Sequence, residues 1–328
     1  MLALASPASL KGVLSAVEAA GLVGTGLRRV DGIEVDELPV ADGGEGTMEV
    51  LAAVVGGAWG IAEVSDPLGR QIAARYLMLP TGLAVVEAAE AIGLSRLEPE
   101  ELDPVRASSR GLGELLLAVL FAARPAAVLV CLGGVATVDG GAGLRGVIGN
   151  TLGAQRIIAA CDVSNPLLGD RGAARAFGPQ KGATPEMVEE LEARLEGMRE
   201  LRPLRDMPGA GAAGGLGAMF AAVGAELTSG ADRVLELIGF EDRASMASLV
   251  VTGEGTVDRS TQEGKAPGKV AEACVRLGVR CVVFGGRVEE DVPDVETRRL
   301  SGRPEYAAED LVELGEQLAR QLVSGSLA

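Results

Sequence analysis

The sequence predicts an α/β protein with two domains, and three observations lead to this prediction. Several short apolar runs are followed by a glycine-rich loop and then by a helical pattern, which is the order of a parallel sheet with crossover helices. The stretch 61–86 differs, because three short strand patterns alternate there with tight turns, as in an antiparallel meander. At 328 residues, the chain is long enough for two domains of ordinary size.

The composition limits the class of protein. Apolar residues make up 48% of the chain and aromatic residues only 2%, so the core must be aliphatic. The formal net charge of −16 argues against nonspecific binding to nucleic acid or to anionic membranes. Apolar runs are interrupted well before about 18 residues, so no membrane span is expected. The four cysteines lie in aliphatic runs without Cys-x-x-Cys spacing, which favours free thiols in a reducing cytoplasm.

One absence and one bias narrow the chemistry. The chain has no histidine, so histidine-based triads, imidazole metal sites and histidine general bases are excluded. Arginine supplies most of the positive charge, and a lysine in such a chain marks a position where a compact ammonium group is useful. The lysines are Lys11, Lys181, Lys265 and Lys269.

In the first part of the chain, a helix is expected at 10–20 and a strand at 33–38. Lys11 lies at the start of that helix, where its side chain either meets a bound anion or is simply solvated. The strand leads into a glycine loop that carries Asp42 and Glu45. The elements expected next are a helix at 48–55, strands at 61–64, 72–79 and 83–86, helices at 87–92 and 111–123, and a buried strand at 125–132.

The strand at 125–132 ends in a loop in which five glycines flank Asp139. A carboxylate surrounded mainly by backbone is a candidate for a general base or a metal ligand. The alternative is an aspartate that accepts hydrogen bonds from the N–H groups of its own turn. Further on, a strand is expected at 157–161, helices at 185–201 and 218–224, a strand at 280–284 and a terminal helix at 309–322.

A second strand–loop–helix junction covers residues 249–270. A buried strand at 249–251 runs into a glycine-spaced loop with Glu254 and Asp258, and a helix begins near Pro267. Carboxylates, hydroxyls and Lys265 on one such loop are the groups that a phosphate–metal site needs. The loop is not a Walker A motif, and the two G-x-G-x-x-G matches elsewhere in the chain do not directly follow strands.

Taken together, these loops resemble the glycerate kinase type I family. Residues 39–47 are similar to the family's P-x-A-D-G-G-E-G-T, residues 160–167 to A-C-D-V-x-N-P-L, and residues 177–183 to F-G-P-Q-K-G-A. Further matches lie at 211–217, at 252–255 with Asp258, and at 264–267. Five long matches in the same order are far more specific than any one of them.

The resemblance implies ATP-dependent phosphorylation of D-glycerate, usually to 2-phosphoglycerate, with Mg²⁺. It also implies a flavodoxin- or Rossmann-like doubly wound domain, formed by residues 1–60 and 232–328, with a second mixed α/β domain, residues 61–231, inserted into it. The reaction would take place in a cleft between the two domains. The expected partners are glycerate and ATP, without nucleic acid or membrane, the expected location is the cytoplasm, and a homodimer is one assembly open to the chain.

The same resemblance assigns roles to individual residues. Phosphoryl transfer needs positioning, neutralisation of charge and a proton acceptor. Without histidine, the acceptor must be a carboxylate or a neutral lysine; Asp139 is the first choice and Asp42 the second, with Lys181 as a further catalytic residue. Glu254 and Asp258 would hold Mg²⁺. The residues expected to bind substrate or phosphate are Ser9, Lys11, Gly43, Gly44, Glu45, Gly133, Gly134, Thr137, Asn165, Gly214, Gly215 and Lys265.

The chain departs from the family pattern near these residues. Ala8 replaces an aspartate, Val135 a serine and Val138 an asparagine, and the segment 143–157 is shorter than in the family. These departures leave two alternatives open. One is a non-catalytic relative with a binding or regulatory role, and the other is a kinase of a different small hydroxy acid.

Overall fold

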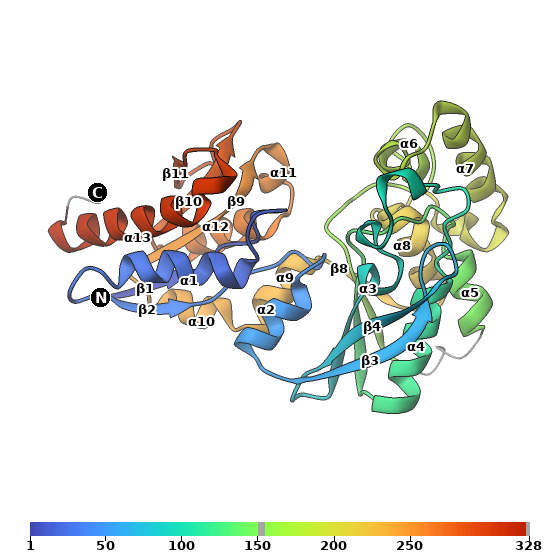
Figure 1. The fold of residues 1–328 in the computed structure, drawn as a ribbon, viewed down its shortest axis with the longest axis horizontal. Coiled ribbons are helices and arrows are strands. Elements are labelled where there is room, and N and C mark those ends of the chain that lie inside the picture. The colour runs from blue at the N-terminus through green and yellow to red at the C-terminus, as the bar shows by residue number, and fades with distance from the viewer. Residues whose placement is uncertain (150–154, 326–328) are drawn as a thin grey trace. The chain divides into compact units, whose positions relative to one another are not determined.

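The computed structural model of the protein describes residues 1–149 and 155–325 (Figure 1). By their contacts, the residues form two compact units. The first unit contains Met1–Asp42, Glu49–Val55 and Ala231–Ala328, and the second contains Gly43–Met48 and Gly56–Gly230. The domain boundaries inferred from the sequence, at 60/61 and 231/232, stay a prediction. Within the described ranges, no helix has both the length and the hydropathy of a membrane span.

The first unit is built on a parallel sheet with the strand order β11-β10-β9-β1-β2. Its strands are β1 (Leu2–Ala5), β2 (Glu34–Glu37), β9 (Leu249–Val257), β10 (Cys281–Val288) and β11 (Glu296–Arg299). The chain goes from β1 to β2 on one side and then crosses to β9 on the other side of β1. This reversal is the topological switch point of a flavodoxin-like sheet, and ligands bind beside the carboxyl ends of the strands at such a point.

Helices α1 (Ala16–Leu27) and α13 (Ala307–Ser324) pack against each other in the first unit (Figure 1). Glycine allows this close contact, because a Cβ atom on Gly26 would lie 2.0 Å from the carbonyl oxygen of Val312. The other helices of this unit include α9 (Gly230–Leu237), α10 (Phe240–Ser245), α11 (Arg259–Gln262) and α12 (Ala266–Leu277), and α2 (Thr47–Val54) has residues in both units.

Two sequence predictions about the first unit are wrong. The helix predicted at 10–20 begins only at Ala16, because Ser15 caps it in a capping box with Glu18. Residues 10–14 form a tight turn instead. The stretch after Val251 is not a loop, because β9 continues to Val257 and pairs with β10 over its whole second half.

The second unit has a six-stranded sheet with the order β3-β4-β5-β6-β7-β8. Its strands are β3 (Ala58–Ser65), β4 (Gln71–Met78), β5 (Leu83–Glu87), β6 (Ala127–Cys131), β7 (Ile157–Ala160) and β8 (Glu226–Thr228). The first three strands are antiparallel, which confirms the meander, and β5 to β8 are parallel. The carboxyl ends of these four parallel strands therefore meet at one edge of the sheet. The mixed α/β class expected from the sequence is confirmed.

The helices of the second unit are α3 (Ala88–Ile92), α4 (Arg110–Ala123), α5 (Ala142–Ile148), α6 (Ala173–Phe177), α7 (Pro185–Gly197) and α8 (Ala212–Ala222). Helix α7 ends four residues before its predicted end at 201. The helix predicted at 218–224 begins earlier, and a left-handed kink at Ala213, Gly214 and Gly215 interrupts its first turn. Residues 150–154 of the shortened segment lie outside the described residues.

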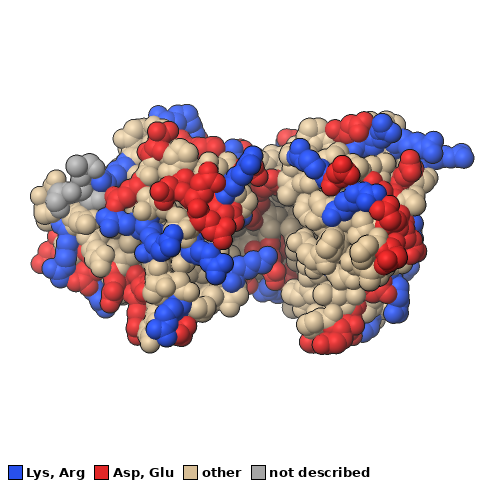
Figure 2. Space-filling model, turned by 90° about the horizontal axis from the view of Figure 1, so that it is seen from above, with Lys and Arg blue, Asp and Glu red and all other residues tan. Residues whose placement is uncertain are grey.

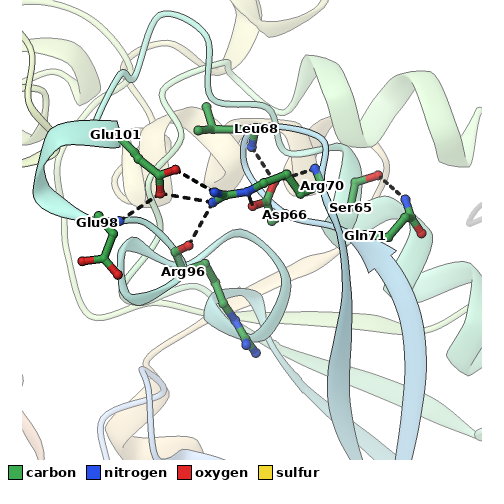
Figure 3. A network of polar contacts seen from close by, with 8 residues as sticks. All are labelled: Ser65, Asp66, Leu68, Arg70, Gln71, Arg96, Glu98 and Glu101. Atoms are coloured by element: carbon green, nitrogen blue, oxygen red, sulfur yellow. Dashed lines mark hydrogen bonds and ion pairs between the residues drawn. The ribbon is translucent and has the colours of Figure 1, made fainter.

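The turn between β3 and β4 is fixed by a polar network (Figure 3). The buried carboxylate of Asp66 accepts hydrogen bonds of 2.8 Å from the backbone N–H groups of Leu68 and Arg70. The guanidinium of Arg70 pairs with both Asp66 and Glu101. On the face shown in Figure 2, acidic and basic side chains are interspersed.

Candidate active site

The carboxyl ends of β1 and β9 lie beside a pocket of about 420 Å³ in the first unit. The loop after β1 contributes Ser9 and Lys11, strand β9 contributes Glu254, and Lys265 lies at the start of α12. The structure thus brings four of the predicted site residues together at the switch point of the sheet. The sequence analysis missed four further polar residues of the lining, which are Thr256, Arg287, Arg303 and Asp310.

Glu254 is the central carboxylate of this pocket. Its Oε2 accepts a 3.0 Å hydrogen bond from the ammonium group of Lys265, and its Oε1 accepts a 2.8 Å hydrogen bond from the hydroxyl of Thr261. Burial nevertheless raises the pKa of Glu254 above its usual range, because the loss of hydration outweighs the attraction of Lys265. This carboxylate therefore gains from any further cation that comes near it.

Asp258 lies at the end of β9 and caps the short helix α11. Its Oδ1 accepts hydrogen bonds from the backbone N–H and the hydroxyl of Ser260, which lower the pKa of this carboxyl group. The ammonium nitrogen of Lys265 is 3.9 Å from Asp258, so one lysine is shared by both predicted metal ligands. Among the described residues, no group of three or more histidine, cysteine, aspartate or glutamate side chains is placed so that it could hold a metal ion.

The cations at the pocket differ in how strongly they are engaged. Lys11 is exposed and makes no hydrogen bond or ion pair within residues 1–149 and 155–325. Arg287, the strand partner of Thr256 in the register of β9 and β10, has its nearest carboxylate, Glu289, at 3.9 Å. These two cations are available to an incoming anion.

In the second unit, the loop 43–48 contacts the carboxyl ends of the parallel strands. A Cβ atom on Gly133 would lie 2.6 Å from the Cα atom of Gly44, so the two glycines touch backbone to backbone. Glu87, at the end of β5, accepts hydrogen bonds from the N–H groups of Gly46 (3.2 Å) and Met48 (2.6 Å). This buried carboxylate was missed in the sequence analysis, because only the fold places it beside a loop some 40 residues earlier.

The other predicted residues of this loop have different surroundings. Gly43 lies against β7 and the residues after β8, since a Cβ atom there would be 2.7 Å from the Cα atom of Gly230. Glu45 is exposed, and its carboxylate faces Gly134, whose φ of 73° favours glycine. Asp42 is also exposed, and its contacts group it with the first unit.

A second group of predicted residues lies inside the second unit around Lys181. The ammonium group of Lys181 is almost fully buried and donates a 2.8 Å hydrogen bond to the carbonyl oxygen of Thr137. Burial lowers the pKa of Lys181 to about 7, although the charge of Asp139 acts in the opposite direction. The carbonyl of Thr137 also contacts Gly214, where a Cβ atom would be only 2.0 Å away.

Asp139 accepts four hydrogen bonds. Its Oδ2 receives the backbone N–H (2.9 Å) and hydroxyl (2.8 Å) of Ser109 and the N–H of Gly143 (3.1 Å), and its Oδ1 receives the N–H of Gly141 (3.0 Å). Three of these donors are backbone groups, two of them from its own turn. The contacts match the alternative interpretation of a turn aspartate, which anchors the loop before α5.

The remaining predicted residues also hold loops together. The side-chain amide of Asn165 donates to the carbonyl of Arg171 (2.7 Å), and Gly215 lies against Gly140. Two of the departures from the family pattern, Val135 and Val138, belong to the hydrophobic core of this unit. At these positions, the chain has apolar packing contacts.

A doubly wound sheet with lysines, arginines and carboxylates at its switch point fits an enzyme that binds a small anionic ligand, and a phosphotransferase with an alcohol group as acceptor is one such enzyme. The chain belongs to the glycerate kinase family, whose family model matches residues 3–156 and 147–311. The two matched ranges overlap at 147–156.

Individual relatives agree with this assignment. The glycerate 2-kinase of Escherichia coli K12 is 37% identical over 326 residues, covering 88% of this chain and 85% of that protein. The glycerate kinase of Bacillus subtilis 168 is 37% identical over 325 residues, covering 87% and 85%. A crystal structure of a protein provisionally designated glycerate kinase 2, from Salmonella typhimurium LT2, superimposes with a TM-score of 0.86 at 32% identity, over 100% of both chains.

Proposed function

We propose that this protein transfers the γ-phosphoryl group of ATP to a hydroxyl group of D-glycerate and forms 2-phosphoglycerate. In this reaction, the hydroxyl oxygen bonds to the γ-phosphorus, the bond to the bridging oxygen of ADP breaks, and the hydroxyl proton passes to a base. The observation that carries the proposal is the meeting of Lys11, Glu254 and Lys265 at the switch-point pocket of a glycerate kinase family member. Relatives named glycerate kinase or glycerate 2-kinase support the choice of substrate.

The basic residues of the pocket match the first need of phosphoryl transfer, which is to balance negative charge. Lys11 and Lys265 would neutralise phosphate oxygens, and Lys265 is already held in place by Glu254. Neither lysine is deeply buried, so each can reach a ligand while its own solvation is only partly lost.

The donor set around Lys265 fits Mg²⁺. Magnesium in kinases is usually held by one or two carboxylates together with phosphate oxygens and water, and Glu254 and Asp258 supply two carboxylates that share one lysine. When bound, the ion would offset the charge that develops on the phosphate oxygens. The raised pKa of Glu254 agrees with this role, since a divalent cation would stabilise its ionised form.

Asp42 and Asp139 are the two candidate proton acceptors of the reaction. A general base needs an oxygen that is free to reach the substrate hydroxyl. The oxygens of Asp139 already accept four hydrogen bonds, so this residue could act as the base only if it gave up at least one of them. The Asp42→Asn and Asp139→Asn variants separate the two assignments.

The proposal is tested by the release of ADP from ATP and Mg²⁺ with D-glycerate as acceptor, followed in a coupled assay. Phosphorus NMR of the product then identifies which hydroxyl carries the phosphoryl group, and a panel of other hydroxy acids tests the choice of acceptor. Turnover with D-glycerate above all other acids is expected. Binding of ATP and D-glycerate in calorimetry without any turnover would instead identify a non-catalytic relative.

A further inference from the structure

We infer that the pocket at the switch point of the first unit is the nucleotide site, with Arg287 and Arg303 as phosphate-binding residues that the family motifs do not include. This inference rests on the proposed function, because it assigns ATP rather than D-glycerate to one particular pocket. Both ligands are anions, so the presence of lysines alone does not distinguish them. The size of the pocket, the charge of its lining and its apolar surface distinguish ATP from D-glycerate.

The size of the pocket favours the nucleotide. A volume of about 420 Å³ lies in the range of pockets that enclose drug-sized ligands, roughly 300–1,000 Å³. A small hydroxy acid would leave most of this volume to water, whereas a nucleotide would fill it.

The charge of the lining favours a polyanion. Four cations, Lys11, Lys265, Arg287 and Arg303, line the pocket together with two carboxylates, Glu254 and Asp310. Both carboxylates are already engaged, because Glu254 pairs with Lys265, and Asp310 accepts hydrogen bonds from the hydroxyl (2.6 Å) and N–H (3.1 Å) of Ser301. An excess of cations at one pocket in a chain of net charge −16 matches a triphosphate better than a single carboxylate.

The two arginines are free enough to bind phosphate. The side chain of Arg287 is 73% exposed, and among residues 1–149 and 155–325 its one ion pair is a distant one of 3.9 Å, to Glu289. Arg303 is 60% exposed, pairs with Glu305 two residues away, and lies over the ring of Tyr306 at 4.5 Å. A planar guanidinium can form two parallel hydrogen bonds to phosphate oxygens, which an exposed carboxylate neighbour does not prevent.

The rest of the lining provides an apolar surface for the aromatic base of a nucleotide. Leu10, Val13, Leu300, Pro304 and Ala307 form an apolar part of the pocket. Val13 is 40% exposed, although it is a β-branched apolar residue. A flat aromatic base would cover such a surface, whereas D-glycerate has no apolar group of that size.

The test compares the Arg287→Gln and Arg303→Gln variants with a matched control, Arg276→Gln. Arg276 is another exposed arginine of the first unit, paired with Glu241 and absent from the lining of this pocket. Calorimetry with MgATP and, separately, with D-glycerate gives the Kd of each ligand for each protein. Each pocket variant is expected to raise the Kd for MgATP by about tenfold, the loss of one charge-assisted contact, and to leave that for D-glycerate unchanged.

Three outcomes overturn the inference. Wild-type protein that does not bind MgATP has no nucleotide site here, and pocket variants that bind MgATP as tightly as Arg276→Gln show that these arginines do not contact it. A Kd that rises for D-glycerate instead assigns the pocket to the acid. Failure of the proposed function is distinct, because wild-type protein would then bind MgATP through these arginines but release no ADP with D-glycerate.

Discussion

The buried lysine of the second unit gives the sharpest prediction. Lys181 has a pKa of about 7 in the folded protein, against an ordinary value of 10.5. Between these two values, the unfolded chain binds a proton that the folded chain does not, so this lysine makes the protein more stable as the pH rises. The destabilisation caused by burying Lys181 has its full size below pH 7 and disappears as the pH approaches 10.5.

The size of the effect follows from the shift. Each pH unit between the two pKa values changes the free energy of unfolding by about 1.4 kcal/mol, so the wild type gains about 2–3 kcal/mol from Lys181 between pH 6 and pH 9. The Lys181→Met variant has no such gain. It loses the hydrogen bond to Thr137, which leaves a buried carbonyl unpaired and costs about 1–3 kcal/mol at every pH.

Urea unfolding at pH 6, 7.5 and 9 measures this difference. Trp59, the only tryptophan of the chain, lies on β3 and reports the unfolding of the second unit by its fluorescence. The gap in stability between wild type and Lys181→Met should shift by about 2–3 kcal/mol in favour of the wild type from pH 6 to pH 9. Lys269→Met, in the first unit, serves as the control and should show no such shift. If the free energies of unfolding of wild type and Lys181→Met change in parallel with pH, the lowered pKa of Lys181 is refuted.

Three further predictions concern the two sites. Lys265→Met leaves the carboxylate of Glu254 without its cation, so it should lower kcat at least tenfold and raise the pKa of Glu254 further. An unchanged kcat in the ADP-release assay would exclude Lys265 from the reaction. Glu87→Ala removes the acceptor of two backbone N–H groups and should destabilise the second unit by about 2–4 kcal/mol in urea unfolding. The exposed Glu63→Ala is the control, and a loss of stability in Glu87→Ala that is smaller than in this control would contradict the anchoring role. Gly133→Ala should destabilise the same unit by about 1–3 kcal/mol, because its Cβ atom would lie 2.6 Å from the Cα atom of Gly44. Gly146→Ala, in open space on α5, is the matched control and should unfold at the same urea concentration as the wild type.

Much of the fold could be predicted from the sequence, because its signals are local. The meander of β3 to β5 follows from strand patterns separated by turn residues, and the start of α12 from Pro267 at the first turn. The first helix was placed too early, since the apolar spacing at 10–14 continues into α1 while Ser15 and Glu18 mark its true start. The end of β9 was missed for a different reason: glycines at 253 and 255 are typical of a loop, but pairing with β10 keeps them in the sheet.

The residues of the candidate site also divide into those that could be found from the sequence and those that only the fold brings to the site. Residues close together in the sequence, such as Glu254 and Lys265, could be found from the sequence, because their spacing already places them together. Arg287, Arg303 and Glu87 could not, because each is an ordinary charged residue until the sheet order brings it beside a distant loop. Asp139 looks like a catalytic carboxylate in the sequence, and only its four hydrogen-bond donors show how firmly the fold holds it.

The sequence by itself determined the α/β class, the family, and the lysines and carboxylates on which the proposed chemistry depends. The class follows from hydrophobic period and glycine spacing, and the family follows from the resemblance of several short motifs in the same order. All of these are properties of short segments. The tertiary structure alone decided that the sheet reverses its order between β1 and β9, which residues line the pocket there, and that Lys181 is buried. Those features depend on contacts between segments far apart in the chain, and burial sets both the charge state of a side chain and the strength of its contacts.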